Sequence, residues 1–178
     1  MTHPLSGNTP LPGSTPLPER PGQVLLLEDN ETTGLRDGEG SVARAADGSL
    51  LLAYTHFEDG GADHSKAVVV TRRSTDGGAT WSGRACLATP PAGALNVMSV
   101  SLLPLRDGRL ACVYILKWTA KTRLIPYFCT SADSGRTWSA AVPVTEEEGY
   151  FVVNNDRLIQ LDSGRLVLPS AHHRRKPG

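Results

Sequence analysis

The sequence lacks the features that mark nucleic-acid-binding and membrane proteins. Its 18 basic and 18 acidic residues give a formal net charge of +0, whereas nucleic acids and anionic membranes are usually bound by an excess of Lys and Arg. The longest apolar runs, such as 24–27 and 67–70, are far shorter than the roughly 20 residues needed to span a bilayer. We therefore expect no nucleic-acid partner and no membrane partner.

Cysteine is scarce as well. The three cysteines, Cys86, Cys112 and Cys129, are odd in number and lack a Cys-x-x-Cys pair or a nearby His at metal-ligand spacing. This pattern indicates neither a disulfide framework nor a zinc site. We expect buried free thiols on strands, with no metal site and no cofactor. Residues 1–22 also lack a basic segment followed by an apolar one, so no secretory signal is indicated and a cytoplasmic location is the default expectation.

Proline is concentrated at the beginning of the chain. Residues 1–22 contain six of the 13 prolines and a duplicated Thr-Pro-Leu-Pro at 9–12 and 15–18. Such a segment is typical of an extended or disordered leader. From residue 23, short runs rich in Val, Leu and Ile alternate with Gly, Asp, Asn and Ser clusters about every 8–12 residues. The sequence therefore predicts a leader over 1–22 and an all-β domain over 23–178.

An internal repeat defines the architecture. Residues 74–81 and 131–138 share the pattern S-x-D-x-G-x-T-W at an offset of 57, and the upstream pairs Asp47-Gly48 and Asp107-Gly108 are 60 residues apart. A third copy begins at Asp162. Each complete unit divides into four expected strands, over 41–46, 49–57, 66–73 and 82–88 in the first unit and 98–105, 109–117, 123–130 and 139–145 in the second.

Four antiparallel strands repeated every 50–60 residues are typical of the blades of a β-propeller. We expect blades over about 36–90 and 94–146, and an incomplete blade over 150–178. Asp76 and Asp133 are expected to close the third turn of each blade, with Trp81 and Trp138 in the core. The predicted fold class is thus an all-β propeller of four-stranded antiparallel blades, about two and a half of which are present.

The two S-x-D-x-G-x-T-W segments resemble the Asp-box, or bacterial neuraminidase repeat, of the sialidase-like superfamily of six-bladed propellers. The resemblance covers about residues 23–176, including 150–158 and 164–166, which look like a third blade. It implies the N-terminal half of an exo-sialidase-like glycoside hydrolase that cleaves a terminal acidic sugar, such as sialic acid, from a glycan or sialoside substrate. The alternatives are a non-catalytic propeller that binds glycans or proteins, and an inactive truncated fragment. Open sheet edges in a partial ring also favour self-association.

Propeller geometry indicates where a site would lie. The starts of the inner strands and the loops between second and third strands share one face around the axis. In this sequence the three inner-strand starts fall at 36–41, 96–99 and 154–157, and the matching loops fall at 57–64, 117–122 and 171–174. These six segments are expected to form one polar patch.

The resemblance assigns roles within this patch. The general acid of the sialidase-like family lies on the second-to-third-strand loop of the first blade, which makes Asp63 the catalytic candidate and Asp59 its alternative. The first arginine of the family lies in an Arg-Ile-Pro motif that is absent here, so Arg36 is only a displaced candidate and specificity for sialic acid is left open. Guanidinium groups suit a sugar carboxylate because they bind it in bidentate geometry. The remaining substrate-binding candidates are Glu39, Asn96, Trp118, Asn154, Asn155, Asp156 and Arg157.

Overall fold

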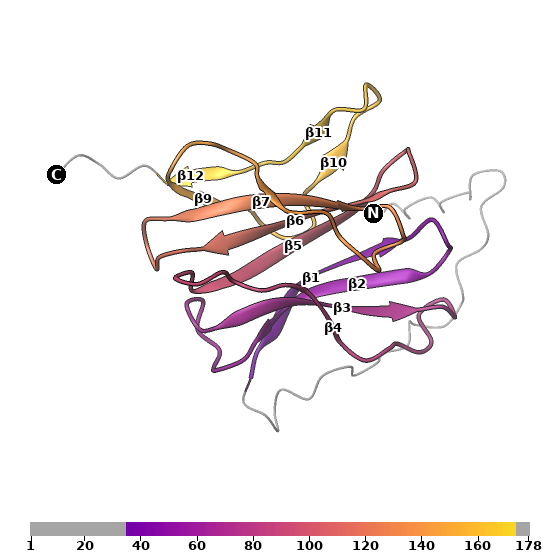
Figure 1. Ribbon diagram of the computed structural model, residues 1–178, viewed down its shortest axis with the longest axis horizontal. Helices are drawn as coiled ribbons and strands as arrows, with labels where there is room; N and C mark the ends of the chain where they lie inside the picture. Colours follow the sequence, from indigo (N-terminus) through magenta and orange to yellow (C-terminus); the bar gives the residue numbers. More distant parts are fainter. Residues whose placement is uncertain (1–34, 174–178) are drawn as a thin grey trace, which may run out of the picture.

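The computed structural model describes residues 35–173, which form an all-β fold (Figure 1). The expected leader over 1–22 and the basic C-terminal residues 174–178 lie outside the described residues. No helix is present over 35–173, so this range contains no helical membrane span.

The first sheet is the expected first blade. Its strands β1 (Asp37–Arg44), β2 (Leu50–Phe57), β3 (Ala67–Ser74) and β4 (Ala85–Ala88) lie in that order, and each is antiparallel to its neighbour. Asp47 and Gly48 lie in the tight turn between β1 and β2, where Gly48 has a φ of 84°. This left-handed conformation is one that glycine adopts without a steric penalty. The Asp-Gly signal therefore marked the hairpin correctly.

The second blade repeats this arrangement. Strands β5 (Asn96–Pro104), β6 (Leu110–Lys117), β7 (Leu124–Ser131) and β8 (Val142–Pro143) are antiparallel in sequence order. β8 is only two residues long and pairs with Tyr127 and Phe128, so it leaves the first part of β7 uncovered. The prediction of four-stranded antiparallel blades is confirmed.

The third unit differs from the expectation. Strand β9 (Tyr150–Val152) joins the sheet of the second blade and does not open a third blade. It runs parallel to β7, beside the part of β7 that β8 leaves unpaired. On its other side β9 pairs with the antiparallel strand β12 (Ala171–His173). An uncovered strand edge offers unpaired backbone groups, and the Leu124 amide donates to Gly149 O at 2.9 Å. The third unit itself is the two-stranded hairpin of β10 (Ile159–Gln160) and β11 (Leu166–Val167).

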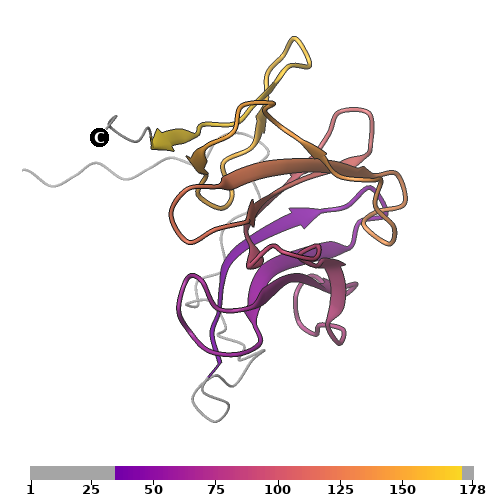
Figure 2. The same cartoon turned by 60° about the vertical axis from the view of Figure 1, so that its left-hand side comes forward.

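The core lies between the first two sheets, which are stacked in Figure 2 with the β10–β11 hairpin on the far side of the second. Alternate residues of β2 face this seam, because successive strand side chains point to opposite faces. Leu51, Ala53 and Phe57 are at most 1% exposed. Leu51 and Ala53 belong to the same buried cluster as Val100 and Leu102 of β5. Burial of this alternating face holds the two blades together.

Two of the three cysteines are buried as expected. Cys112 and Cys129 lie directly opposite each other on β6 and β7, face the inter-sheet core and are free thiols. The prediction was wrong for Cys86, which is exposed. Cys86 lies on the outermost strand of the first blade, β4, where three of four residues are at least partly exposed.

The two repeated turns share one hydrogen-bond pattern. In the first, the Ser74 hydroxyl donates to Asp76 Oδ1 at 2.8 Å and accepts from the Gly78 amide at 2.8 Å. The Thr80 amide and hydroxyl donate to the two Asp76 carboxylate oxygens at 2.9 and 2.6 Å. These bonds lower the pKa of Asp76 to about 2, the hydroxyl of Thr80 being the largest cause. The aspartates therefore close turns, as expected.

The same bonds recur at Ser131, Asp133, Gly135 and Thr137 in the second turn. The tryptophans that follow the turns are less buried than expected. Trp138 is half-buried and packs against the inter-sheet core. Trp81 is half-buried, donates Nε1 to Gly78 O at 3.1 Å, and packs against no core cluster of the described residues. Within residues 35–173, Trp138 packs against a core that both blades share, and Trp81 does not.

Gly135→Ala is expected to destabilise the fold more than Gly108→Ala. Both glycines have a left-handed φ, of 82° and 85°, and the left-handed conformation alone costs an alanine about 1–2 kcal/mol. A Cβ at position 135 would also lie 2.6 Å from Leu51 Cδ2 in the core, whereas nothing lies within 4 Å of one at 108. Overpacking adds about 1–3 kcal/mol. Urea denaturation measures both losses, and equal losses would contradict the role of the Leu51 contact.

Thr80→Ala is expected to raise the pKa of Asp76 from about 2 toward its ordinary value of 3.8. Because the folded-state pKa is the lower one, the Asp76 bonds stabilise the fold above about pH 4 and lose this effect as pH falls toward 2. In Thr80→Ala, the stabilisation that ionised Asp76 provides should therefore be lost at a higher pH than in the natural chain. NMR titration of the Asp76 carboxyl measures the change. Thr137→Ala, in the other turn, is the control that should leave Asp76 unaltered.

Candidate functional site

Polar residues gather along one edge of the two sheets. The starts of β1 and β5, the ends of β2 and β6, and the loops 58–66 and 118–123 all lie at this edge, on the left in Figure 1. The hairpins and Asp turns lie at the opposite edge. This is the arrangement that the propeller geometry predicted, and side-chain contacts across the edge join segments that are far apart in sequence.

Arg36 links the two central carboxylates. Its Nη1 donates to Asp63 Oδ1 at 2.6 Å and to Gly61 O at 3.1 Å, while Nη2 lies 3.5 Å from Glu39 Oε1. The guanidinium also stacks over the Phe57 ring, with Cζ 4.5 Å from the ring centroid. The hydrogen bond from Arg36 is the main cause that lowers the pKa of Asp63, and burial opposes it. Asp63 is thus held in its ionised form.

Glu39 is fixed by donors from both blades. Its Oε2 accepts from the amide and the hydroxyl of Ser99, each at 3.0 Å, and from the Thr55 hydroxyl at 3.3 Å. Oε1 has only the longer contact to Arg36. The Glu39 side chain is 24% exposed, compared with 67% for Asp63. One carboxylate oxygen is therefore held between the blades and the other is turned toward Arg36.

Asn96 and Lys117 form the floor beneath the 58–66 loop. Asn96 is fully buried, and its Nδ2 donates to Asp63 O at 3.1 Å and to Ser65 O at 2.8 Å. The buried Lys117 donates Nζ to Asp63 O at 2.8 Å. Asn96 Oδ1 is buried with no hydrogen-bond partner among residues 35–173. These contacts fix the backbone of Asp63, and within the described chain Asn96 Oδ1 remains as an unpaired acceptor beneath the 58–66 loop.

The segment 154–157 joins the cluster from the third unit. Asp156 accepts from the Ser41 hydroxyl at 2.7 Å, and Asn155 donates Nδ2 to Gly40 O at 3.0 Å. Asp156 is thus bonded to Ser41 and not to the neighbouring arginine. Arg157 and Asn154 line an open hollow of about 370 Å³ whose other lining residues are Val152, Pro169, Ser170 and Ala171. The segment that precedes the β10–β11 hairpin therefore adds polar groups to this face.

Two sequence candidates are placed differently. Asp59 accepts from the Lys66 amide at 2.6 Å, so it closes its own loop, and no hydrogen bond or ion pair in the described range joins it to Arg36 or Glu39. Trp118, expected to be exposed, is half-buried against the core with Arg123 stacked 4.4 Å from its ring centroid. Its Nε1 is buried without a partner in the described chain. The indole thus presents less free surface than predicted.

Ser99 and Thr55 are site residues that the sequence analysis did not single out. Ser99 occupies the place in the second unit that Glu39 occupies in the first, 60 residues earlier. The repeat could therefore have identified it. Nothing in the local sequence distinguishes Thr55, which only the pairing of β2 brings near Glu39.

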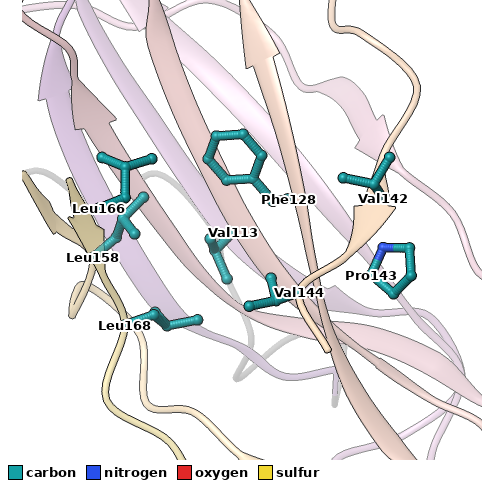
Figure 3. A pocket seen from close by; sticks show the side chains of 8 residues that line it. All are labelled: Val113, Phe128, Val142, Pro143, Val144, Leu158, Leu166 and Leu168. Atoms are coloured by element: carbon teal, nitrogen blue, oxygen red, sulfur yellow. The ribbon is translucent and has the colours of Figure 1, made fainter. Parts of the chain in front are cut away.

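A separate apolar cavity of about 350 Å³ lies between the second blade and the β10–β11 hairpin (Figure 3). Its eight lining side chains are all apolar: Val113, Phe128, Val142, Pro143, Val144, Leu158, Leu166 and Leu168. It offers no side-chain group that could hydrogen-bond a sugar, so we do not assign it to the polar site.

His172 and His173, which we expected in a loop at 171–174, lie on strand β12 instead. They form β12 with β9, where His172 stacks on Phe151 at a centroid distance of 4.2 Å. Both histidines line a hollow of about 460 Å³ with Lys121, Thr122, Glu147, Glu148, Gly149 and Tyr150. Among residues 35–173 no three His, Cys, Asp or Glu side chains are grouped to hold a metal ion.

Several solved structures are similar to this chain. A protein of unknown function from Dyadobacter fermentans is 18% identical, with a TM-score of 0.59 over 75% of this chain and 46% of its own. A GH93 α-L-arabinofuranosidase from Fusarium graminearum, in complex with arabinobiose, is 18% identical, with a TM-score of 0.51 over 73% of this chain and 37% of its own. An α-L-arabinanase from Penicillium chrysogenum, also in complex with arabinobiose, is 21% identical, with a TM-score of 0.51 over 71% of this chain and 38% of its own.

This chain therefore spans less than half the length of each of these proteins. No family model and no curated protein matches it. At these identities the likeness establishes the fold, and the chain is a partial β-propeller.

Arg36→Gln is expected to raise the pKa of Asp63 toward 3.8, because it removes both the principal hydrogen bond and the nearby positive charge. The loss of ionised Asp63 should then occur at a higher pH as the solution is acidified. NMR titration of the Asp63 carboxyl measures this change. Arg123→Gln, which breaks the comparable ion pair with Glu148, is the matched control and should leave Asp63 unaffected. An unchanged Asp63 pKa in Arg36→Gln would refute the role of this guanidinium.

Proposed function

We propose that this chain is part of a glycoside hydrolase that removes a terminal sugar from a glycan. The observation that carries the proposal is the pair of carboxylates, Glu39 and Asp63, joined by one guanidinium at the open edge of the blades. Glycoside hydrolysis commonly uses two carboxyl groups about 5–10 Å apart, and two carboxylates that contact one guanidinium are close enough to act on one bond. The arabinan-degrading enzymes with a similar fold add support.

The two carboxyl groups would have different roles. Glu39 is fixed by Ser99 and Thr55 with Oε1 facing Arg36, which suits a carboxylate that stabilises positive charge on the sugar ring. Asp63, our candidate acid, is ionised while Arg36 binds it. A general acid must instead hold a proton near the working pH. Asp63 can therefore act as the acid only after Arg36 has moved away.

A sugar carboxylate would provide a reason for that movement, because it competes with Asp63 for the guanidinium. We infer that an acidic terminal sugar, such as sialic acid, is the substrate class that best activates Asp63. Arg36 would then bind the sugar carboxylate, and the released Asp63 would take up a proton from solvent and transfer it to the leaving oxygen. Asn154 and Arg157 line the hollow of about 370 Å³; Asn154 would bind sugar hydroxyls, and Arg157 would help to position the substrate.

A binding propeller without catalysis is the second candidate. The observation that favours it is the hydrogen bond from Arg36 that lowers the pKa of Asp63, since an ionised carboxylate accepts hydrogen bonds from hydroxyl groups but donates no proton. In that case the same face would bind glycans and leave the glycosidic bond intact.

The test is release of a fluorophore from a panel of aryl glycosides, including a sialoside, a glucuronide and an arabinofuranoside, by the full chain. We expect turnover of an acidic glycoside, with kcat reduced about 10²- to 10⁴-fold by Asp63→Asn or Glu39→Gln. Glu146→Gln, which removes an exposed carboxylate outside the Glu39–Asp63 cluster, is the control. Binding of a glycoside without turnover would support the binding propeller. Turnover of neutral glycosides alone would refute the specificity for an acidic sugar. Absence of both binding and turnover would refute the proposed function.

A further inference from the structure

Three residues in this face have an uncommon backbone conformation. Glu39, Ser99 and Asp156 have φ values of 55°, 55° and 57°, in the left-handed region that disfavours residues with a Cβ. They occupy equivalent places in the three units, at intervals of 60 and 57 residues. Ser134, with a φ of 62° in the second Asp turn, is the other such residue in the described chain. Glycine would adopt these angles with less strain.

Each of the first two residues lies in an irregularity of an inner strand. The pairing of β1 with β2 shifts between Gly38 and Ser41, and the pairing of β5 with β6 shifts between Met98 and Ser101. A bulge of this kind re-aims a side chain and is common beside binding sites. Asp156 is connected to the second bulge, since its amide donates to Val100 O at 3.2 Å. The two bulges thus direct Glu39 and Ser99 to the region where the blades meet, and Asp156 is bonded beside the second bulge.

The contacts of Ser99 indicate what its side chain does. Its hydroxyl and its amide both donate to Glu39 Oε2, and the amide also lies 3.2 Å from Thr55 Oγ1. Ser99 is only 7% exposed, so a ligand has little access to it. Its effect on a ligand would have to pass through Glu39.

We propose that Ser99 is a positioning residue that orients the Glu39 carboxylate, and that the strained bulge of β5 is retained for this purpose. The proposal rests on the proposed function, in which Glu39 faces the sugar. The left-handed conformation of Ser99 aims its amide and its hydroxyl at the same carboxylate oxygen. The second blade thereby fixes the carboxylate supplied by the first.

Two substitutions separate strain from function. Ser99→Gly and Ser99→Ala both delete the hydroxyl, but glycine relieves the left-handed strain and alanine retains it. We expect the melting temperature to fall less in Ser99→Gly than in Ser99→Ala, because both lose the hydroxyl bond to Glu39 and only glycine relieves the strain. We expect kcat to fall in both, on the order of 10- to 100-fold, with KM changed less than about twofold because the substrate contacts themselves remain. If Ser99 had a purely structural role, the loss of kcat would parallel the loss of stability and would be smaller in Ser99→Gly than in Ser99→Ala.

Ser134→Gly is the matched control. Residue 134 occupies the place that Gly77, with a φ of 73°, occupies in the first turn, and it lies at the opposite edge of the sheets. This substitution should raise the melting temperature and leave kcat unchanged.

The outcomes distinguish this inference from the proposed function. If the natural chain cleaves a glycoside and Ser99→Gly cleaves it equally fast, Ser99 has no positioning role and the proposed function stands. If the natural chain cleaves no glycoside, the proposed hydrolase function fails, and a crystal structure of Ser99→Gly decides the inference. More than one orientation of the Glu39 carboxylate would support it, and an unmoved carboxylate would overturn it.

Discussion

The carboxylate of Glu39 imposes the strictest requirement on this molecule. It enters the seam between two sheets, where a charged group is costly unless hydrogen-bond donors surround it. Those donors come from Thr55 on the neighbouring strand and from Ser99 on the next blade. The stacking of the blades and the bulges of their inner strands must therefore be correct together for this carboxylate to be accommodated. Arg36 then completes the cluster by linking Glu39 to Asp63.

The architecture could be predicted from the sequence because its signals are local and repeated. The Asp-Gly pairs mark the first hairpins, and the offset of 57 between the Asp turns gives the blade length. Together they placed five of the eight strands of the first two blades within two residues of their observed bounds, whereas β1 begins four residues earlier than expected and β4 and β8 are shorter. They also placed Arg36, Asp63 and Asn96 on one face, because strand direction alternates regularly within each blade.

Pairings that depend on strand length were not predictable in this way. Strand β9 can pair with β7 because β8 is only two residues long. No local sequence pattern indicates that β8 is so short. The exposure of Cys86 has a similar origin, since it depends on β4 being the outermost strand of its blade. Trp118 was misjudged because the stacking of Arg123 on its ring is a contact of side chains within one loop.

The two edges of the sheets have separate tasks. One edge carries the carboxylates and their cations, while the other carries the turns closed by Asp76 and Asp133. The strands between them are about eight residues long, which corresponds to roughly 25 Å of extended chain. A fluorescent label attached at the exposed Asp107-Gly108 hairpin would thus lie far from the polar face. That hairpin is a suitable anchoring point for immobilising the protein with its polar face directed into solution.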